Sequence, residues 1–98
     1  NKLINKMDTD RLIQSVGKQI FIEYYFEFKN RNSQDMINLL ISNNVSNRAG
    51  ANWRVGNAAK IFENNLQREA LEIIINSKRV PYETIKQARK ILMMECKK

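Results

Sequence analysis

Hydrophobic residues recur about every four positions over the first third of the chain. The residues of this stripe are Leu12, Ile13, Val16, Ile20, Phe21, Tyr24, Tyr25 and Phe28. Their spacing predicts one amphipathic helix over residues 10–29, which the short polar run Asp8-Thr9-Asp10 would cap. Residues 20–26 are rich in aromatic and β-branched side chains, which favour strands, but the helical period continues on both sides of them. We therefore predict helix throughout.

Four shorter amphipathic patterns follow, separated by polar links. They predict helices over residues 34–42, 47–64, 66–77 and 81–96. Ser33 and Ser46 stand where the second and third helices would need an N-cap, and Pro81 suits the first position of the last helix. Met93 and Met94 are interpreted as core filler or, alternatively, as part of a contact surface.

The scarcity of chain-breaking residues also favours long helices, since the 98 residues include only three Gly and one Pro. A chain of this length forms one domain and buries roughly 60–65% of its unfolded surface, enough for one modest core. We predict an all-α fold, a compact bundle of about five helices. Residues 8–98 would form this single domain, and residues 1–7 would be a flexible lead-in or a remnant of an upstream segment.

The net charge is +7, from 17 Lys and Arg against 10 Asp and Glu. Residues 66–98 contribute most of it, with eight basic and four acidic residues. A positive balance raises the affinity for polyanions such as DNA, RNA or acidic protein surfaces. The alternative is that the charge only keeps a small domain in solution, so charge alone does not assign a function.

The residue types that carry catalysis and metal binding are scarce. The chain has no His, and its one cysteine, Cys96, cannot form an internal disulfide. Gly17 and Lys18 lack the spacing of a phosphate-binding loop, and Glu69 and Glu72 are interpreted as a solvated pair on a helix. We therefore expect no catalytic residues, no metal and no cofactor, and we do not expect an enzyme.

No apolar run approaches the roughly 18 residues that a membrane-spanning helix needs. No signal-peptide pattern opens the chain either. From these two features we expect a cytoplasmic protein with no membrane partner.

The stretch from residue 33 to residue 65 has the outline of a helix-turn-helix: a short helix, a polar link anchored by Val45, and a longer helix. In such a motif the second helix enters the major groove of DNA. The link is longer than the usual tight turn, and Ile37 and Asn38 stand where a small residue is usual. The helix-turn-helix is therefore a hypothesis that the pattern favours without requiring it.

The predicted helix over residues 47–64 carries side chains suited to nucleic acid, because Arg pairs with guanine edges, Asn with adenine edges, and Lys with phosphates. The candidates are Arg48, Asn52, Arg54, Asn57 and Lys60. Trp53 shares one side of the helix with Asn57, Lys60 and Asn64. There it would stack on a base, anchor a protein contact, or turn inward and fill the core.

A second group of cations falls on the predicted helix over residues 81–96. Lys86, Arg89 and Lys90 are spaced so that they share one face, opposite the apolar residues. Such a stripe can follow the phosphates of a nucleic acid, but an ordinary solvated face has the same pattern.

These features predict a nucleic-acid-binding domain within a larger protein, with double-stranded DNA as the expected partner and RNA as another. The alternative is a protein-interaction or dimerisation domain. Ile22 and Phe26 fall outside the main apolar stripe of the first helix, and with Tyr25 they would form an aromatic face for a homodimer. Otherwise that helix is buried nearly all round.

Overall fold

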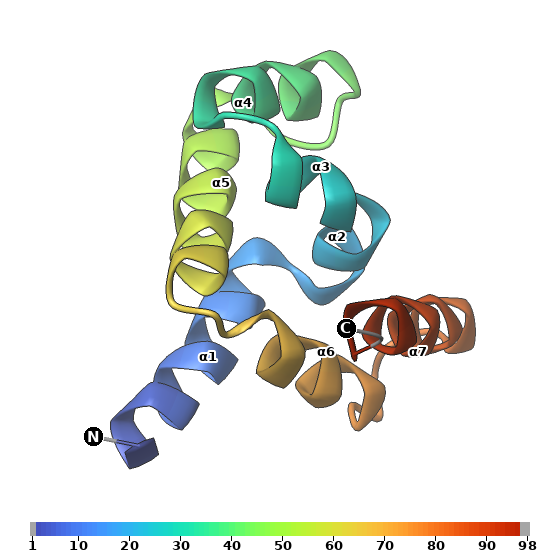
Figure 1. The fold of residues 1–98 in the computed structure, drawn as a ribbon. Helices are drawn as coiled ribbons and strands as arrows, with labels where there is room; N and C mark the ends of the chain where they lie inside the picture. The colour runs from blue at the N-terminus through green and yellow to red at the C-terminus, as the bar shows by residue number, and fades with distance from the viewer. Residues whose placement is uncertain (1, 97–98) are drawn as a thin grey trace.

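Seven helices and no strand make up the part of the chain that the computed structural model describes, which is the backbone of residues 2–96 and the side chains of residues 9–95. The helices are α1 (Lys2–Val16), α2 (Lys18–Glu23), α3 (Tyr25–Asn30), α4 (Ser33–Ser42), α5 (Arg48–Glu63), α6 (Gln67–Ile75) and α7 (Tyr82–Cys96) (Figure 1). The predicted all-α fold is confirmed. The number of helices exceeds five because the first predicted helix is divided into three.

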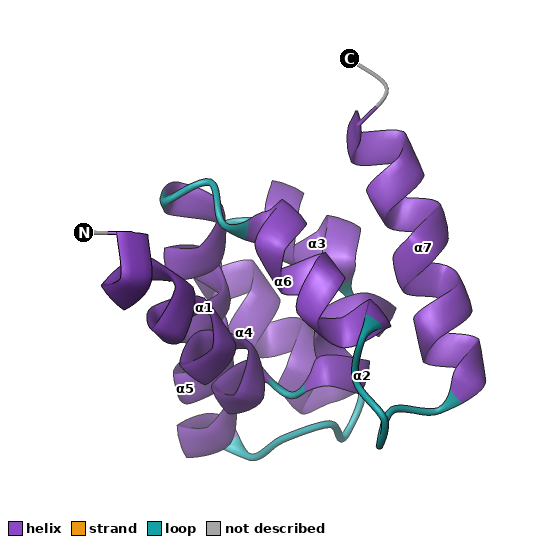
Figure 2. Ribbon diagram, turned by 90° about the horizontal axis from the view of Figure 1, so that it is seen from below, coloured by secondary structure: helices purple, strands orange, loops and turns teal. Residues whose placement is uncertain are grey.

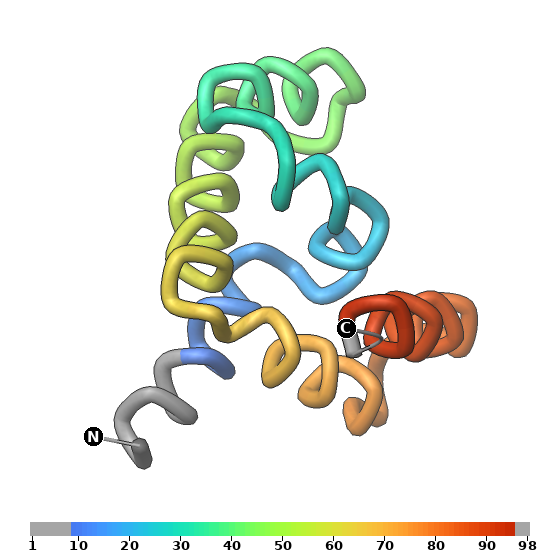
Figure 3. Tube along the Cα trace, in the orientation of Figure 1, coloured from blue at the N-terminus to red at the C-terminus, as the bar shows by residue number. Residues whose placement is uncertain are grey.

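The first predicted helix, over residues 10–29, is wrong in its extent. α1 begins at Lys2, so Asp8-Thr9-Asp10 lies within the helix instead of capping it, and the backbone of residues 2–7 belongs to it. The side chains of residues 1–8 lie outside the described part. The chain changes direction between α1 and α2 (Figure 3), and a second break at Tyr24 separates α2 from α3. The apolar period continues across both breaks because it records burial and not the direction of the backbone.

Gly17 is the residue that permits the first break. Its φ of 97° lies in the left-handed region, which residues with a side chain rarely adopt. A Cβ atom at this position would also lie 2.8 Å from Nη1 of Arg54. That nitrogen donates a hydrogen bond to the carbonyl oxygen of Val16, at the end of α1. The backbone angle therefore requires glycine here, and a side chain would also displace the end of Arg54.

The four later helices lie within two residues of their predicted bounds. The predicted caps Ser33 and Ser46, in contrast, are each wrong by one residue. Asn32 caps α4, because its side chain accepts a hydrogen bond from the amide of Asp35 at 2.8 Å, and Asn47 caps α5 in the same way. Both asparagines have extended backbone angles, which place the side-chain oxygen over the first turn.

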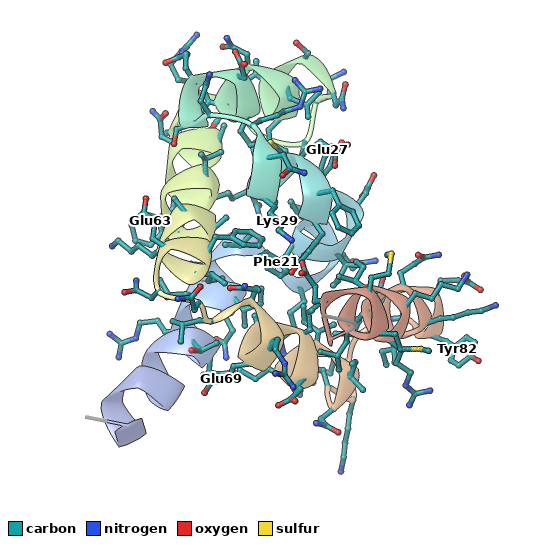
Figure 4. All side chains as sticks on the ribbon, viewed as in Figure 1. Phe21, Glu27, Lys29, Glu63, Glu69 and Tyr82 are labelled. Atoms are coloured by element: carbon teal, nitrogen blue, oxygen red, sulfur yellow. The ribbon has the colours of Figure 1, made fainter. Side chains whose placement is uncertain are left out.

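An aromatic cluster forms the centre of the core. Phe21 and Tyr25 pack on Phe62 of α5 with ring centroids 5.8 and 5.3 Å apart, and Phe21 also stacks on Phe28. Figure 4 shows Phe21 in the space that α5, α2 and α3 enclose. These contacts hold α5 against the α2–α3 segment, while α4 packs across the beginning of α5 (Figure 1).

The aromatic face predicted for a homodimer is not a surface. Ile22 is 7% exposed and Tyr25 only 1%, so both belong to the core of this chain. Phe26 alone of the three remains exposed. The other interpretation of this segment, burial nearly all round, is wrong too: α3 packs on α5 and α2 packs on α7, but Gln19, Glu23 and Phe26 are exposed.

α5 and α7 lie on opposite sides of the molecule in two perpendicular views (Figures 1 and 2). α7 packs on α6 and α2. Met93 and Met94 on α7 are both exposed, so the prediction that they fill the core is wrong. The molecule measures 32 × 31 × 29 Å along its principal axes. None of the helices within residues 2–96 is long and apolar enough to cross a bilayer.

Candidate functional site

α5 turns one face to the core and the other to solvent. Its buried residues are Ala51, Val55, Asn57, Ala58 and Ile61. Its exposed residues include Arg48, Ala49, Asn52, Trp53, Gly56 and Lys60. The small alanines on the inner face allow α1 and α4 to pack closely on this helix. The outer face combines an aromatic ring, an amide, two cations and the carboxylate of Glu63 with residues that have almost no side chain.

A groove of about 480 Å³ lies along one edge of this outer face, between α1 and α5. The residues that line it are Arg11, Leu12, Ser15, Trp53, Asn57, Lys60, Asn64 and Leu66. The predicted grouping of Trp53 with Asn57, Lys60 and Asn64 on one side of a helix is confirmed. α1 supplies the second wall of this groove.

Trp53 forms the aromatic part of this lining and is 63% exposed. Of the roles weighed for it from the sequence, filling the core is therefore excluded. Asn57 is largely buried, and its Nδ2 donates a hydrogen bond to the carbonyl oxygen of Trp53 at 2.7 Å. Asn64 donates in the same way to the carbonyl oxygen of Lys60 at 2.8 Å. Because both amide nitrogens bond to the helix backbone, the side-chain oxygens remain as acceptors.

The groove carries positive charge on both walls. Arg11 on α1 and Lys60 on α5 are exposed, and its described lining residues include no carboxylate. Glu63 lies on the outer side of α5 (Figure 4), and Asp10 accepts a hydrogen bond from Gln14 at 3.0 Å. The lining groups can stack on a planar ring, accept hydrogen bonds and attract a phosphate.

The structure shows Arg54, a predicted nucleic-acid contact, bonded within the chain. Its Nε donates to Oγ of Ser46 at 2.9 Å, and its Nη1 donates to the carbonyl oxygen of Val16 at 2.5 Å. The guanidinium therefore donates to the last carbonyl of α1 and ties that end to the link before α5. The same fork of donors suits both tasks, which is why the sequence did not distinguish them.

The other predicted residues do not form one surface. Arg48 and Asn52 are exposed in the first two turns of α5, outside the groove lining. Lys86, Arg89 and Lys90 are exposed on α7, on the other side of the molecule (Figures 1 and 2). The two cationic regions noted in the sequence are thus separate in space.

Sequence reasoning missed the wall that α1 contributes. Arg11 and Ser15 are four residues apart, on either side of Leu12, and this spacing places them along one edge of a helix. That local signal was available. Which helix packs beside this edge was not, because the contact joins segments about 40 residues apart, as the 38-residue separation of Val16 and Arg54 illustrates.

No group of three or more Cys, Asp or Glu side chains within the described residues is placed to hold a metal ion. Comparisons of the chain with protein-family models, with curated proteins and with solved structures found no match. The function of the domain is therefore inferred from the geometry and chemistry of the site.

Proposed function

We propose that this domain binds double-stranded DNA through the outer face of α5. The composition of that face carries the proposal: Arg48, Asn52 and Lys60 are exposed along it, with Ala49 and Gly56 between them and Glu63 as the one carboxylate of the helix. The helical period places these positions on one continuous arc. A Cβ atom at Gly56 would meet no atom within 4 Å, so the face is open there. Small residues between donors let a helix approach base edges in the major groove.

The arrangement of α4 and α5 supports this assignment. The link over residues 43–47 joins the two helices, and α4 packs across the beginning of α5. A duplex held against α5 would therefore have α4 near its backbone, as in a helix-turn-helix. Gln34 and Asn38 are exposed on α4 and are uncharged donors of the kind that contact phosphates. The first turn of α5 contains no acidic residue, which suits a phosphate at the positive end of the helix.

Lys86, Arg89 and Lys90 are not assigned to this interface. A straight duplex seated on the outer face of α5 does not face α7, because the two helices lie on opposite sides of the molecule (Figures 1 and 2). These exposed cations therefore provide charge-matched controls for the cations of α5.

Fluorescence anisotropy with a labelled duplex at several salt concentrations tests the proposal. Arg48→Ala/Lys60→Ala removes two positive charges from α5, and Lys86→Ala/Lys90→Ala removes two from α7, so the variants have equal net charge. We expect the α5 variant to bind about 10-fold more weakly and to lower the salt slope by about 1.8, as two lost phosphate contacts would. The α7 variant should change the affinity by less than about 3-fold.

Three results would contradict this assignment. Equal losses from the two variants would show that net charge alone drives binding, with no contribution specific to α5. Tighter binding of single-stranded or double-stranded RNA than of the DNA duplex would replace DNA as the partner. If no duplex binds even at low salt, DNA binding itself is rejected.

A further inference from the structure

The groove between α1 and α5 is large enough for a ligand of its own. Its volume of about 480 Å³ lies within the range of roughly 300–1,000 Å³ that is usual for small-ligand sites. Trp53 lines it and is largely exposed to solvent. An indole that is fixed on a helix and uncovered offers a ready face on which a planar ring can stack.

The polar lining specifies what kind of planar ring fits. Asn57 and Asn64 each use their amide nitrogen on a backbone carbonyl of the same chain, at 2.7 and 2.8 Å. These two bonds fix the orientation of both side chains and leave the oxygens to accept. Acceptors match the exocyclic amino groups of adenine, cytosine and guanine, which thymine lacks.

The cations specify what accompanies the ring. Arg11 approaches from α1 and Lys60 from α5, and both side chains are exposed at the groove. Two cations on facing walls, with no carboxylate among the described lining residues, favour an anion between them. A ring with amino groups next to an anion is the chemistry of a nucleotide.

We propose that the groove holds one unpaired nucleobase together with its phosphate. The domain then prefers DNA that carries an unpaired adenine, cytosine or guanine over a fully paired duplex. This inference rests on the proposed binding of DNA by α5. Trp53 and Lys60 border both the groove and the outer face of α5, so a base that leaves a duplex seated there meets the groove directly. A base that is already unpaired spares the cost of breaking a pair.

The experiment uses three duplexes of one sequence: fully paired, with one unpaired adenine, and with one unpaired thymine. Trp53 is the only tryptophan of the chain, so its emission reports stacking directly. We expect the unpaired adenine to bind about 5- to 10-fold more tightly than the paired duplex and to quench Trp53. The unpaired thymine should give a smaller preference, because it brings no amino group to the two asparagine oxygens.

Arg11→Gln tests the groove without altering the outer face of α5, since Arg11 lies on α1. Arg89→Gln on α7 removes the same charge far from the groove and serves as the matched control. We expect Arg11→Gln to lose the preference for unpaired adenine while it binds the paired duplex about as tightly as Arg89→Gln does. Both arginines are exposed, and far-UV circular dichroism of each variant verifies the fold.

The outcomes separate the two proposals. Equal affinity for the three duplexes, with Trp53 emission the same in all, would overturn the groove and leave binding by α5 intact. A preference for unpaired adenine that persists in Arg11→Gln without quenching of Trp53 would place the base elsewhere and overturn it too. Failure of all three duplexes to bind would reject both proposals.

Discussion

α5 and α7 are nearly equal in length, and both carry exposed cations, yet they are held in the fold in different ways. α5 packs against α1, α3 and α4 and buries residues along its whole length. α7 packs on α6 and α2 and leaves Met93 and Met94 uncovered. Figure 4 shows Tyr82 at the outer end of α7, directed away from the rest of the molecule.

The basic residues of the two helices have correspondingly different roles. On α5, Arg48 is exposed, Arg54 bonds to the end of α1, and Lys60 borders the groove. On α7, Lys86 and Arg89 are exposed to solvent. Three cations of α5 thus have three structural settings, which sequence composition does not distinguish. The neighbours of a charged residue, and not its charge, decide whether it belongs to a site.

The last turn of α7 is nevertheless tethered to α3. Tyr25 donates a hydrogen bond from its hydroxyl to Glu95 at 2.6 Å, and Nζ of Lys29 bonds to both carboxylate oxygens of Glu95 at 2.9 and 3.0 Å. The Glu95 side chain is 8% exposed. Burial, followed by the hydrogen bond and the charge of Glu95, raises the pKa of Tyr25 above its ordinary value.

The largest expected difference between the two helices is in their contribution to stability. Ile61 of α5 is fully buried, and Ile91 of α7 is 6% exposed at a contact with fewer neighbouring helices. We expect Ile61→Ala to cost about 3–5 kcal/mol of unfolding free energy and Ile91→Ala about 2 kcal/mol, because a cavity enclosed on all sides collapses less. Urea denaturation followed by circular dichroism measures both. Equal losses would mean that α7 is as closely integrated as α5.

The second prediction compares two arginines. Arg54→Ala removes two hydrogen bonds and leaves the carbonyl of Val16 without that donor, so we expect a loss of about 2 kcal/mol. Arg89→Ala on α7 should change the unfolding free energy by less than about 0.5 kcal/mol, since its side chain is exposed. Arg54→Lys should recover little, because an ammonium group does not reproduce the fork. A similar, small effect of the two alanine variants would contradict the structural role of Arg54.

The smallest effect concerns the tether between α3 and α7. Tyr25→Phe removes the hydroxyl and should cost about 1 kcal/mol at pH 8. Because the pKa of Tyr25 is higher in the folded than in the unfolded chain, its contribution to stability is complete below about pH 10 and is lost as the pH rises above that value. The urea midpoint should therefore fall more between pH 8 and pH 11 in the parent protein than in Tyr25→Phe. Parallel pH profiles would argue against the tether.

The helical class and the bounds of four helices could be predicted because both depend on local patterns. Apolar residues three and four positions apart mark a buried helix face, and polar links interrupt it. The division of the first helix could not be predicted in this way. Gly17 stands inside an unbroken apolar period, and its left-handed backbone is stabilised where Arg54, 37 positions later in the sequence, bonds to Val16.

The candidate site, too, was predictable from the sequence only in part. By itself, the sequence determined that Trp53, Asn57, Lys60 and Asn64 share one side of a helix, since helical geometry alone dictates that arrangement. Only the tertiary structure decided that Trp53 faces solvent, that Arg54 turns inward, and that Arg11 completes the groove. Each of these depends on which helices pack together. A contact between segments so far apart in the chain does not alter the hydrophobic periodicity of either segment.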